Sequence, residues 1–305
     1  MAFNNIRNSL RELIAKIPML EKLVLQPWRT FRLHSYYRSL LPLAQLDEAS
    51  RNMWLGRIDK VKRSSDNQRI AKINQAGTLQ KGKLVMHNGL IIDPLSYYGA
   101  PVMRMLMENQ AVHEPQEEYV FQEVLKYIPE NATMLEVGCY WGFYSMWFAS
   151  KIKGAKNYLA DNADGIARAK ANFKINGLQA TFITGYIGRD VADSPVAITN
   201  VDRICQENNI EFLDIMHADI QGYEMEMLET MPELLSKNGI GYFFISTHSN
   251  ELHQSCIEFL KSKGFLILCH ADLNDSFSED GLIVARNPSY PGPDVFEISL
   301  MRKQI

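Results

Sequence analysis

Three short segments hold the side chains whose types and spacing best suit chemistry. The first is the loop Glu136–Gly142, in which Gly138 and Gly142 stand four residues apart and let the backbone turn sharply against a ligand. A dinucleotide-binding loop would carry glycine where Tyr140 stands, so a pyrophosphate would meet a bulky side chain. A sulfonium amino acid has no pyrophosphate, and the charge of Glu136 suits its positive groups. A tight strand-to-helix turn without a ligand is the alternative.

The second segment is the pair Asp161 and Asn162. Asp161 ends the second predicted strand, 19 residues past Gly142, where an acidic residue can accept hydrogen bonds from both hydroxyls of a ribose. The alternative is that Asp161 or Asn162 only caps the next helix. Gly185, after the third predicted strand, is assigned to the same cofactor site. Because parallel strand ends lie side by side, these signals together predict a cofactor site there.

The third segment is His217–Glu224, and His248 lies further along the chain. Asp219 follows the fourth predicted strand and His248 the fifth, so both are expected at the rim beside the first strand. An unperturbed histidine has a pKa of about 6.5, so His248 is the predicted general base for a hydroxyl acceptor. Asp219 is the second predicted catalytic residue, and it could orient His248, contact cofactor or acceptor, or hold a divalent cation.

Four side chains are the predicted substrate contacts: His217, Gln221, Glu224 and His248. Simpler explanations stay open, because His217 could be a core histidine, Glu224 could stabilise the first turn of its helix, and His248 could bond to backbone. A cation held by Asp219, Glu224 and His248 is possible. The sequence has no dense cluster that requires a metal, so no metal ligand is assigned.

The segment His217–Glu224 resembles a motif of the FkbM family of methyltransferases, Lys-x-Asp-x-Glu-Gly-x-Glu. Asp219, Gly222 and Glu224 match it, whereas Gln221 replaces the first glutamate and a histidine replaces the lysine. The loop that begins at Glu136 is similar to the family's Asp-x-Gly-x-Asn-x-Gly. Glu136 replaces its aspartate, and a tyrosine, residue 140, replaces its asparagine.

Two further segments extend the resemblance to about residues 113–287. Asp161-Asn162 stands where the family has Glu-Pro, and Asp280–Ala285 is also similar. The resemblance implies S-adenosylmethionine as the cofactor. It further implies O-methylation of a hydroxyl group on a sugar, a glycan or a small-molecule natural product.

Strands and helices are expected to alternate from Ala132 onward. Alternation of this kind indicates a mostly parallel α/β sheet covered on both faces, with seven predicted strands. The resemblance implies that this fold is Rossmann-like and of the methyltransferase type. The predicted strands are Thr133–Val137, Asn157–Ala160, Ala180–Thr184, Phe212–Ala218, Gly241–Ser246, Phe265–Cys269 and Gly281–Ala285. The predicted helices are Phe143–Lys151, Ala163–Asn176, Asn200–Asn208, Met225–Lys237 and Asn250–Lys263.

Residues 1–110 are predicted to form a mainly helical extension of the methyltransferase domain, residues 111–305. Asn5–Val24 and Leu95–Asn109 show helical spacing, although Pro18 must kink or break the former. A hairpin is expected near residues 83–93, where Asn88-Gly89 is a strong turn signal. The extension is expected to act as a substrate lid or docking lobe.

Composition limits the partners. The net charge of −3 argues against nucleic-acid binding, but residues 1–70 hold 13 Lys and Arg against 6 Asp and Glu, and the remainder holds 19 against 29. The basic segment could contact an anionic membrane surface or could simply be a solvated face. The four cysteines form no CxxC pair, which favours a reducing cytoplasm. Oligomeric state is not predicted.

Two other classes of function stay open. One is a nicotinamide-dependent oxidoreductase, which the side chain of Tyr140 disfavours. The other is a non-catalytic, cofactor-binding scaffold. The joint presence of Glu136, Asp161, Asp219 and His248 argues against loss of chemistry.

Overall fold

The computed structural model describes residues 26–189 and 197–303. The helix predicted over Asn5–Val24 lies outside these ranges. Among the described residues, no helix has the length and apolar character needed to cross a bilayer.

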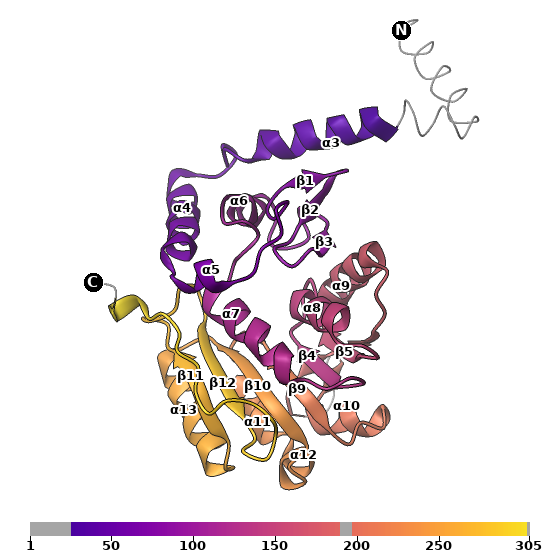
Figure 1. The fold of residues 1–305 in the computed structure, drawn as a ribbon, viewed down its shortest axis with the longest axis vertical. Coiled ribbons are helices and arrows are strands. Elements are labelled where there is room, and N and C mark those ends of the chain that lie inside the picture. The colour runs from indigo at the N-terminus through magenta and orange to yellow at the C-terminus, as the bar shows by residue number, and fades with distance from the viewer. Residues whose placement is uncertain (1–25, 190–196, 304–305) are drawn as a thin grey trace, which may run out of the picture.

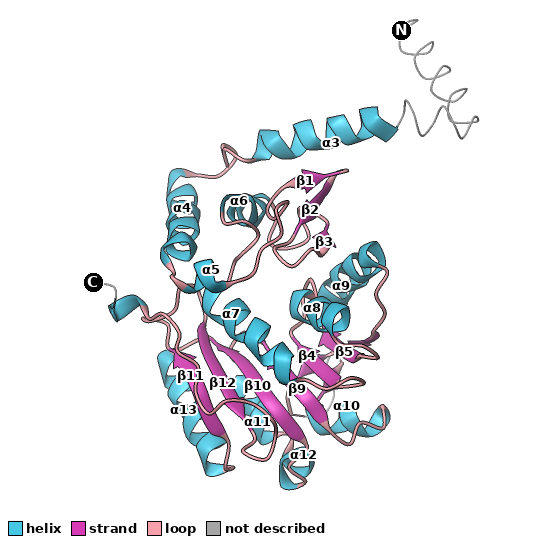
Figure 2. Ribbon diagram, in the orientation of Figure 1, coloured by secondary structure: helices cyan, strands magenta, loops and turns pink. Residues whose placement is uncertain are grey.

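A seven-stranded mixed sheet forms the centre of the molecule, which confirms the expected fold class (Figure 2). The strand order is β11-β12-β10-β9-β4-β5-β6, and β12 alone runs antiparallel to its neighbours. The strands are β4 (Thr133–Val137), β5 (Lys156–Asp161), β6 (Thr181–Thr184), β9 (Leu213–Ala218), β10 (Ile240–Thr247), β11 (Leu266–Ala271) and β12 (Gly281–Arg286). A short parallel pair, β7 (Tyr186–Ile187) with β8 (Ile198–Thr199), follows β6.

Helices cover both faces of this sheet because successive strand side chains alternate between the faces. On β4, Met134 packs into the core cluster of one face, and Leu135 and Val137 pack into that of the other. The first face is covered by α7 (Pro115–Val124), the short 3-10 helix Leu125–Tyr127, α8 (Phe143–Lys151) and α9 (Ala163–Asn176). The second is covered by α10 (Val201–Glu207), α11 (Glu224–Glu229), α12 (Pro232–Ser236) and α13 (Asn250–Ser262).

Two predicted helices differ from the structure. The single helix expected over Met225–Lys237 is wrong, because α11 ends before Pro232 and α12 begins there. Proline lacks an N–H and disfavours helical geometry in the residue before it, which breaks the run. The helix expected from Leu95 begins only at α6 (Ala100–Glu108), since Gly99 adopts a φ of 74° just before it.

The N-terminal part packs on the same core as the sheet. It consists of α3 (Gln26–Leu40), α4 (Glu48–Arg63), α5 (Asp66–Arg69), α6 and a small sheet of β1 (Leu79–Gln80), β2 (Lys83–Val85) and β3 (Ile91–Ile92). In Figure 1 it lies beside α7, α8 and α9, and α3 projects outward. Leu84 and Ile92 of the antiparallel β2–β3 pair share one hydrophobic cluster with Phe121 and Trp147.

The exposed surface of α3 is aromatic and basic. Phe31 is 71% exposed and Tyr36 is 53% exposed, and Arg32 lies over the ring of Trp28. Contact of this segment with an anionic membrane stays a prediction.

The C-terminal residues close over the junction between the N-terminal part and the sheet. The backbone N–H of Ser299 donates to the buried carboxylate of Asp66 at 2.7 Å, and the Ser299 hydroxyl donates to it at 2.6 Å. Gln116, on α7, donates to the Ser299 carbonyl at 2.6 Å. Residues far apart in the chain therefore meet at α5 and α7.

Glu118 of α7 is a fully buried carboxylate. It joins the β2–β3 hairpin to α7, the helix that packs on the seven-stranded sheet. Its oxygens lie 2.7 Å from His87 Nε2 and 2.7 Å from His113 Nδ1, and one also accepts the backbone N–H groups of His113 and Glu114 at 2.8 Å. Burial alone would raise the pKa of Glu118, but the charge of His113 and hydrogen bonds from both histidines hold it well below its usual value. Glu118 is therefore a carboxylate at neutral pH.

Replacing Glu118 with Gln should lower the free energy of unfolding by about 3–5 kcal/mol, because the change leaves buried His113 without its counter-charge. Urea denaturation measures this loss. Because the pKa of folded Glu118 is depressed, its contribution should be present above about pH 4 and fade as the pH falls further. The matched control is Glu130→Gln, at an exposed pair with Lys153, which should change stability by less than about 0.5 kcal/mol. Equal losses in the two variants would contradict the prediction.

Candidate active site

A cavity of about 650 Å³ lies at the carboxyl ends of the central strands. Nine residues predicted for the site contribute to its wall: Glu136, Gly138, Tyr140, Asp161, Asn162, Gly185, His217, Asp219 and Gln221. Three others predicted for the site, Gly142, Glu224 and His248, do not line it. Most of the predicted site residues therefore surround one cavity.

The glycine loop is held in a conformation that side chains rarely adopt. Gly138 has a φ of 73°, and a Cβ there would lie 1.7 Å from the carbonyl oxygen of Asp219. Gly142 also has a φ of 73°, and a Cβ there would crowd the side chain of Leu159. A glycine at this position therefore lets Leu159 pack closely against the loop. Tyr140 has a φ of 41° without being glycine. Asparagine tolerates such angles better, in agreement with the family pattern.

Asp161 fixes the shape of this loop. Its Oδ2 accepts the backbone N–H of Tyr140 at 2.7 Å, and its Oδ1 accepts that of Asn162 at 2.6 Å. Burial raises the pKa of Asp161, although these two hydrogen bonds oppose the rise. Each carboxylate oxygen has a second lone pair, so Asp161 can still accept from a ligand in the cavity. The side chain of Asn162 caps α9 by accepting from Asp164 and Gly165 at 3.0 and 3.1 Å.

Glu136 is more enclosed than its sequence position indicates. It is buried at the end of β4, and its Oε2 accepts the backbone N–H of Ser145 in the first turn of α8 at 3.0 Å. Burial raises its pKa to about 7, against the opposing charge of His217, whose Nδ1 lies 4.0 Å away. Glu136 thus anchors α8 as well as lining the cavity.

His217 is paired with a residue that sequence reasoning missed. Its Nε2 lies 2.7 Å from Glu117 of α7, and Glu117 also accepts from the hydroxyl of Ser246 at 3.2 Å. Burial would lower the pKa of His217, but Glu117 outweighs it and raises the pKa to about 9. A protonated His217 therefore lines the cavity.

Glu114 is a second residue that sequence reasoning missed. Its carboxyl group lines the cavity, accepts the hydroxyl of Tyr144 at 2.9 Å and lies 3.3 Å from Nε2 of His113. Burial raises the pKa of Glu114 to about 7, and the charge of His113 limits the rise. The run of Glu114, Glu117 and Glu118 around a helix start was the available sequence signal.

Aromatic rings form part of the same wall. Tyr97 stacks on Trp141 with centroids 4.7 Å apart, and Tyr98 stacks on Tyr140 at 4.9 Å. Tyr98 is 51% exposed, so one edge of the cavity presents a ring to solvent. Tyr97 and Tyr98 belong to the N-terminal part, and the sequence analysis named neither of them for the site.

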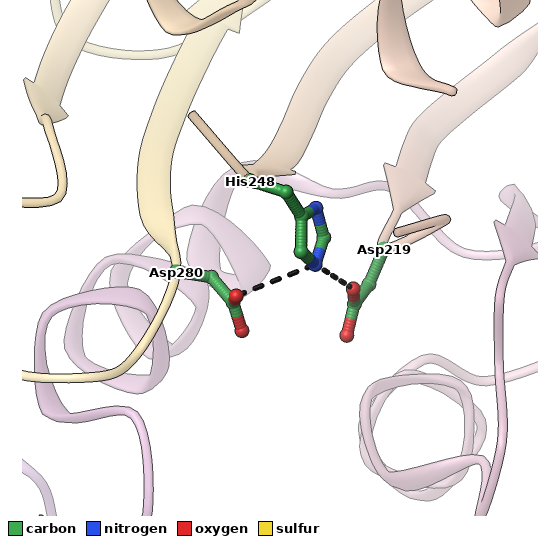
Figure 3. A group of neighbouring side chains, drawn as sticks. All are labelled: Asp219, His248 and Asp280. Carbon is green, nitrogen blue, oxygen red and sulfur yellow. Dashed lines mark ion pairs between the residues drawn. The ribbon is translucent and has the colours of Figure 1, made fainter. Parts of the chain in front are cut away.

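His248 lies between three carboxyl groups beside the cavity. Figure 3 shows two of them, Asp219 and Asp280. Its Nδ1 is 2.9 Å from Glu224, and its Nε2 is 3.4 Å from Asp219 and 3.3 Å from Asp280. Burial would lower its pKa, but the carboxyl groups raise it to about 10. A pKa raised this far disfavours the neutral form that a general base needs, and the role of His248 as the base stays a prediction.

Glu224 and Gln221 shape the segment after β9. Glu224 is fully buried, and its Oε1 accepts the backbone N–H groups of Ile220 at 3.3 Å and Gly222 at 3.1 Å. Gln221 has a φ of 55°, and its side-chain amide donates to Asp219 Oδ1 at 3.1 Å. Glu224 therefore holds both the segment after β9 and the ring of His248 in place, whereas Gln221 lines the cavity.

Two solved structures are each similar to a little more than half of the chain. TrmK from M. capricolum, in complex with S-adenosyl-homocysteine, is 15% identical with a TM-score of 0.41, over 56% of this chain and 69% of that one. A putative rRNA-methylase from Clostridium thermocellum is 13% identical with a TM-score of 0.43, over 58% of this chain and 97% of that one. None of the curated proteins compared by sequence matches the chain.

The family comparison is more specific. The model of the Methyltransferase FkbM domain matches residues 89–267, which is more than half of the chain and includes the glycine loop, Asp161 and the segment His217–Glu224. The match begins inside the β2–β3 hairpin, before the predicted domain boundary at residue 111. The chain therefore belongs to the FkbM methyltransferase family, and S-adenosylmethionine is its methyl donor.

Proposed function

We propose that the protein transfers a methyl group to a hydroxyl oxygen of a sugar, a glycan or a small-molecule natural product. The observation that carries the proposal is the mixed character of one cavity wall. The residues expected to hold the cofactor, Gly138 and Asp161, share this wall with the carboxyl group of Glu114 and the rings of Tyr97 and Tyr98.

The cofactor side of the cavity suits S-adenosylmethionine. A volume of about 650 Å³ falls in the range of ligand pockets. The carboxyl groups of Asp161 and Asp219 suit the positive sulfonium and amino groups, and Asp161 keeps free lone pairs for ribose hydroxyls. When bound, S-adenosylmethionine supplies an electrophilic methyl group on a sulfonium, and the sulfonium becomes a neutral thioether once the acceptor oxygen has taken the methyl group.

The acceptor side combines flat apolar rings with acids. A sugar presents C–H groups on its ring faces and hydroxyl groups at its edge, so aromatic rings can pack on the former while carboxylates take the latter. Tyr97 and Tyr98 supply the rings, and both come from residues 1–110. This origin supports the predicted role of the N-terminal part in acceptor selection.

Glu114 is the proton acceptor in this proposal, in place of His248. At neutral pH a group with a pKa of about 7 is partly ionised and can accept a proton, whereas protonated His248 cannot. The hydroxyl proton passes to Glu114 as the bond between oxygen and methyl carbon forms. Tyr144 holds the carboxyl group in place through its hydroxyl. Asp219, in the same wall, remains a candidate for binding the acceptor hydroxyl.

The family assignment favours this chemistry over a nicotinamide-dependent oxidoreductase. The direct test incubates the protein with S-adenosylmethionine labelled in its methyl group and a panel of sugars, glycans and hydroxylated small molecules, followed by mapping of the labelled atom. Label on an oxygen supports the proposal. Label only on nitrogen or carbon would overturn it.

The Asp161→Ala variant should bind S-adenosylmethionine more weakly by about 1–3 kcal/mol, because the change removes both a ligand contact and the acceptor that shapes the Tyr140 backbone. Isothermal titration calorimetry measures the affinity. The matched control is Asp164→Ala, three residues on and paired with Arg168 at the surface, which should bind as tightly as the wild type. Unchanged affinity in Asp161→Ala would remove this residue from the cofactor site.

The Glu114→Gln variant should methylate the acceptor roughly 10²–10⁴-fold more slowly while binding S-adenosylmethionine normally. In the wild type the rate should rise with pH through about 7, because the carboxylate form of Glu114 becomes populated as the pH increases, and the variant should lack this rise. Charged and titratable groups facing Glu114 come from several elements: Arg57, Tyr97, His113, Glu117, Tyr144, Asp219 and Asp280.

Initial rates across a pH series check this prediction. The control is Glu130→Gln, which removes an exposed carboxylate that precedes β4 in the chain, as Glu114 does. It should keep the wild-type rate and pH profile. A Glu114→Gln protein with the wild-type rate and an unaltered pH profile would exclude Glu114 as the base.

A further inference from the structure

Three ligand atoms of types that bind metal ions converge beside the cavity. Asp219 follows β9, His248 follows β10 and Asp280 precedes β12, three strands that lie next to one another in the sheet. One oxygen of each aspartate and a ring nitrogen of His248 all lie within 4.8 Å of one another (Figure 3). The sheet topology, and not sequence proximity, brings them together.

The orientation of His248 is fixed from its other ring nitrogen. Nδ1 lies 2.9 Å from Oε1 of Glu224, and Glu224 is itself fully buried and tied to the backbone of Ile220 and Gly222. Histidines that bind metals commonly use one nitrogen for the ion and the other for a carboxylate that sets the ring orientation. Glu224 and His248 have this arrangement, with Nε2 directed between the two aspartates.

Nε2 of His248 has no hydrogen-bond partner among the described residues, although the atom is buried. Its distances to Asp219 and Asp280, 3.4 and 3.3 Å, place the two carboxylate oxygens around this one ring nitrogen. The second oxygen of buried Glu224 also lacks a partner among the described residues. A buried carboxylate and a cluster of acids require positive charge nearby. Without a metal ion the protonated ring of His248 supplies it, and a cation on Nε2 would replace that proton.

We infer that Asp219, His248 and Asp280 bind one divalent metal ion of the Mn²⁺ or Mg²⁺ class at the edge of the cavity. Two carboxylate oxygens and one imidazole nitrogen suit an octahedral ion that prefers oxygen ligands and tolerates nitrogen. The three side chains are 17–29% exposed, which leaves room for water or substrate oxygens in the remaining positions.

The site has a direct connection to the proposed reaction, and this part of the inference rests on the proposed function. Asp219 lines the cavity as well as belonging to the cluster. A metal ion there would bind the acceptor hydroxyl oxygen and lower the pKa of that hydroxyl, which assists transfer of its proton to Glu114. Polyhydroxylated acceptors with two neighbouring oxygens would bind this metal ion best, because both oxygens could bind the same ion.

Mn²⁺ binding can be measured without cofactor or acceptor. The full chain is freed of metal with EDTA, dialysed and titrated with Mn²⁺ at neutral pH, while electron paramagnetic resonance records the signal of free Mn²⁺. We expect one bound Mn²⁺ per chain, displaced by excess Mg²⁺. The Asp280→Asn variant should bind at least about tenfold more weakly. Its neighbour Glu279→Gln removes the same charge from an exposed side chain and should bind within twofold of the wild type.

A second readout covers the case in which Asp280→Asn folds poorly. Mn²⁺ should raise the melting temperature of the wild type and of Glu279→Gln, and it should not raise that of Asp219→Asn. Absence of Mn²⁺ binding by the wild type, or equal binding by Asp280→Asn, would overturn the site and leave a protonated His248 as the only cation there. Because these measurements contain no acceptor, failure of O-methylation would leave their result unchanged and would count against the proposed function alone.

Discussion

The carboxylate of Glu118 has no exposed surface and lies between His87 and His113. The positions of most other groups at the site depend on the ion pairs that it makes with these histidines. A charge removed from water must be matched closely, so this one ties the hairpin, the segment before α7 and α7 itself to a single geometry. Glu117 lies in the same first turn of α7, and Glu114 is the N-cap residue just before it. Their places in the cavity wall and against His217 follow once α7 is fixed.

Close backbone contact couples the cofactor loop to the acid-bearing segment. Gly138 has no side chain, so the carbonyl of Asp219 can lie against it, and the Asp219 N–H donates to Val137 at 3.0 Å. Tyr140 is held at a positive φ by the carboxylate of Asp161 from the next strand. Movement in any one of these loops would therefore displace the others.

Local pattern was sufficient to predict the sheet and the glycine loop. β4, α8 and α9 have the predicted bounds, because their apolar spacing, caps and turn residues are all encoded within a few positions. The break between α11 and α12 was also local, at Pro232, but apolar spacing on both sides concealed it. Asp161 and Asp219 were found because strand ends are predictable.

Other site features depend on contacts between residues distant in sequence, which no local pattern reports. His217 meets Glu117 across 100 residues. The pKa of His248 is raised by Asp219, Glu224 and Asp280, which come from separate segments of the chain. The ionisation of a side chain depends on these neighbours and on burial, so the sequence alone could not predict the raised pKa of His248. Glu114 was missed for the same reason.

The contact between Ser299 and Asp66 has a consequence for how the chain is made. Asp66 is completely buried, and its partner is synthesised 233 residues later. Without Ser299, Arg69 is the charged partner that the described residues offer this carboxylate, so the N-terminal part lacks its full packing until the segment around Ser299 is in place. We expect closure of the N-terminal part over the sheet to wait for that segment.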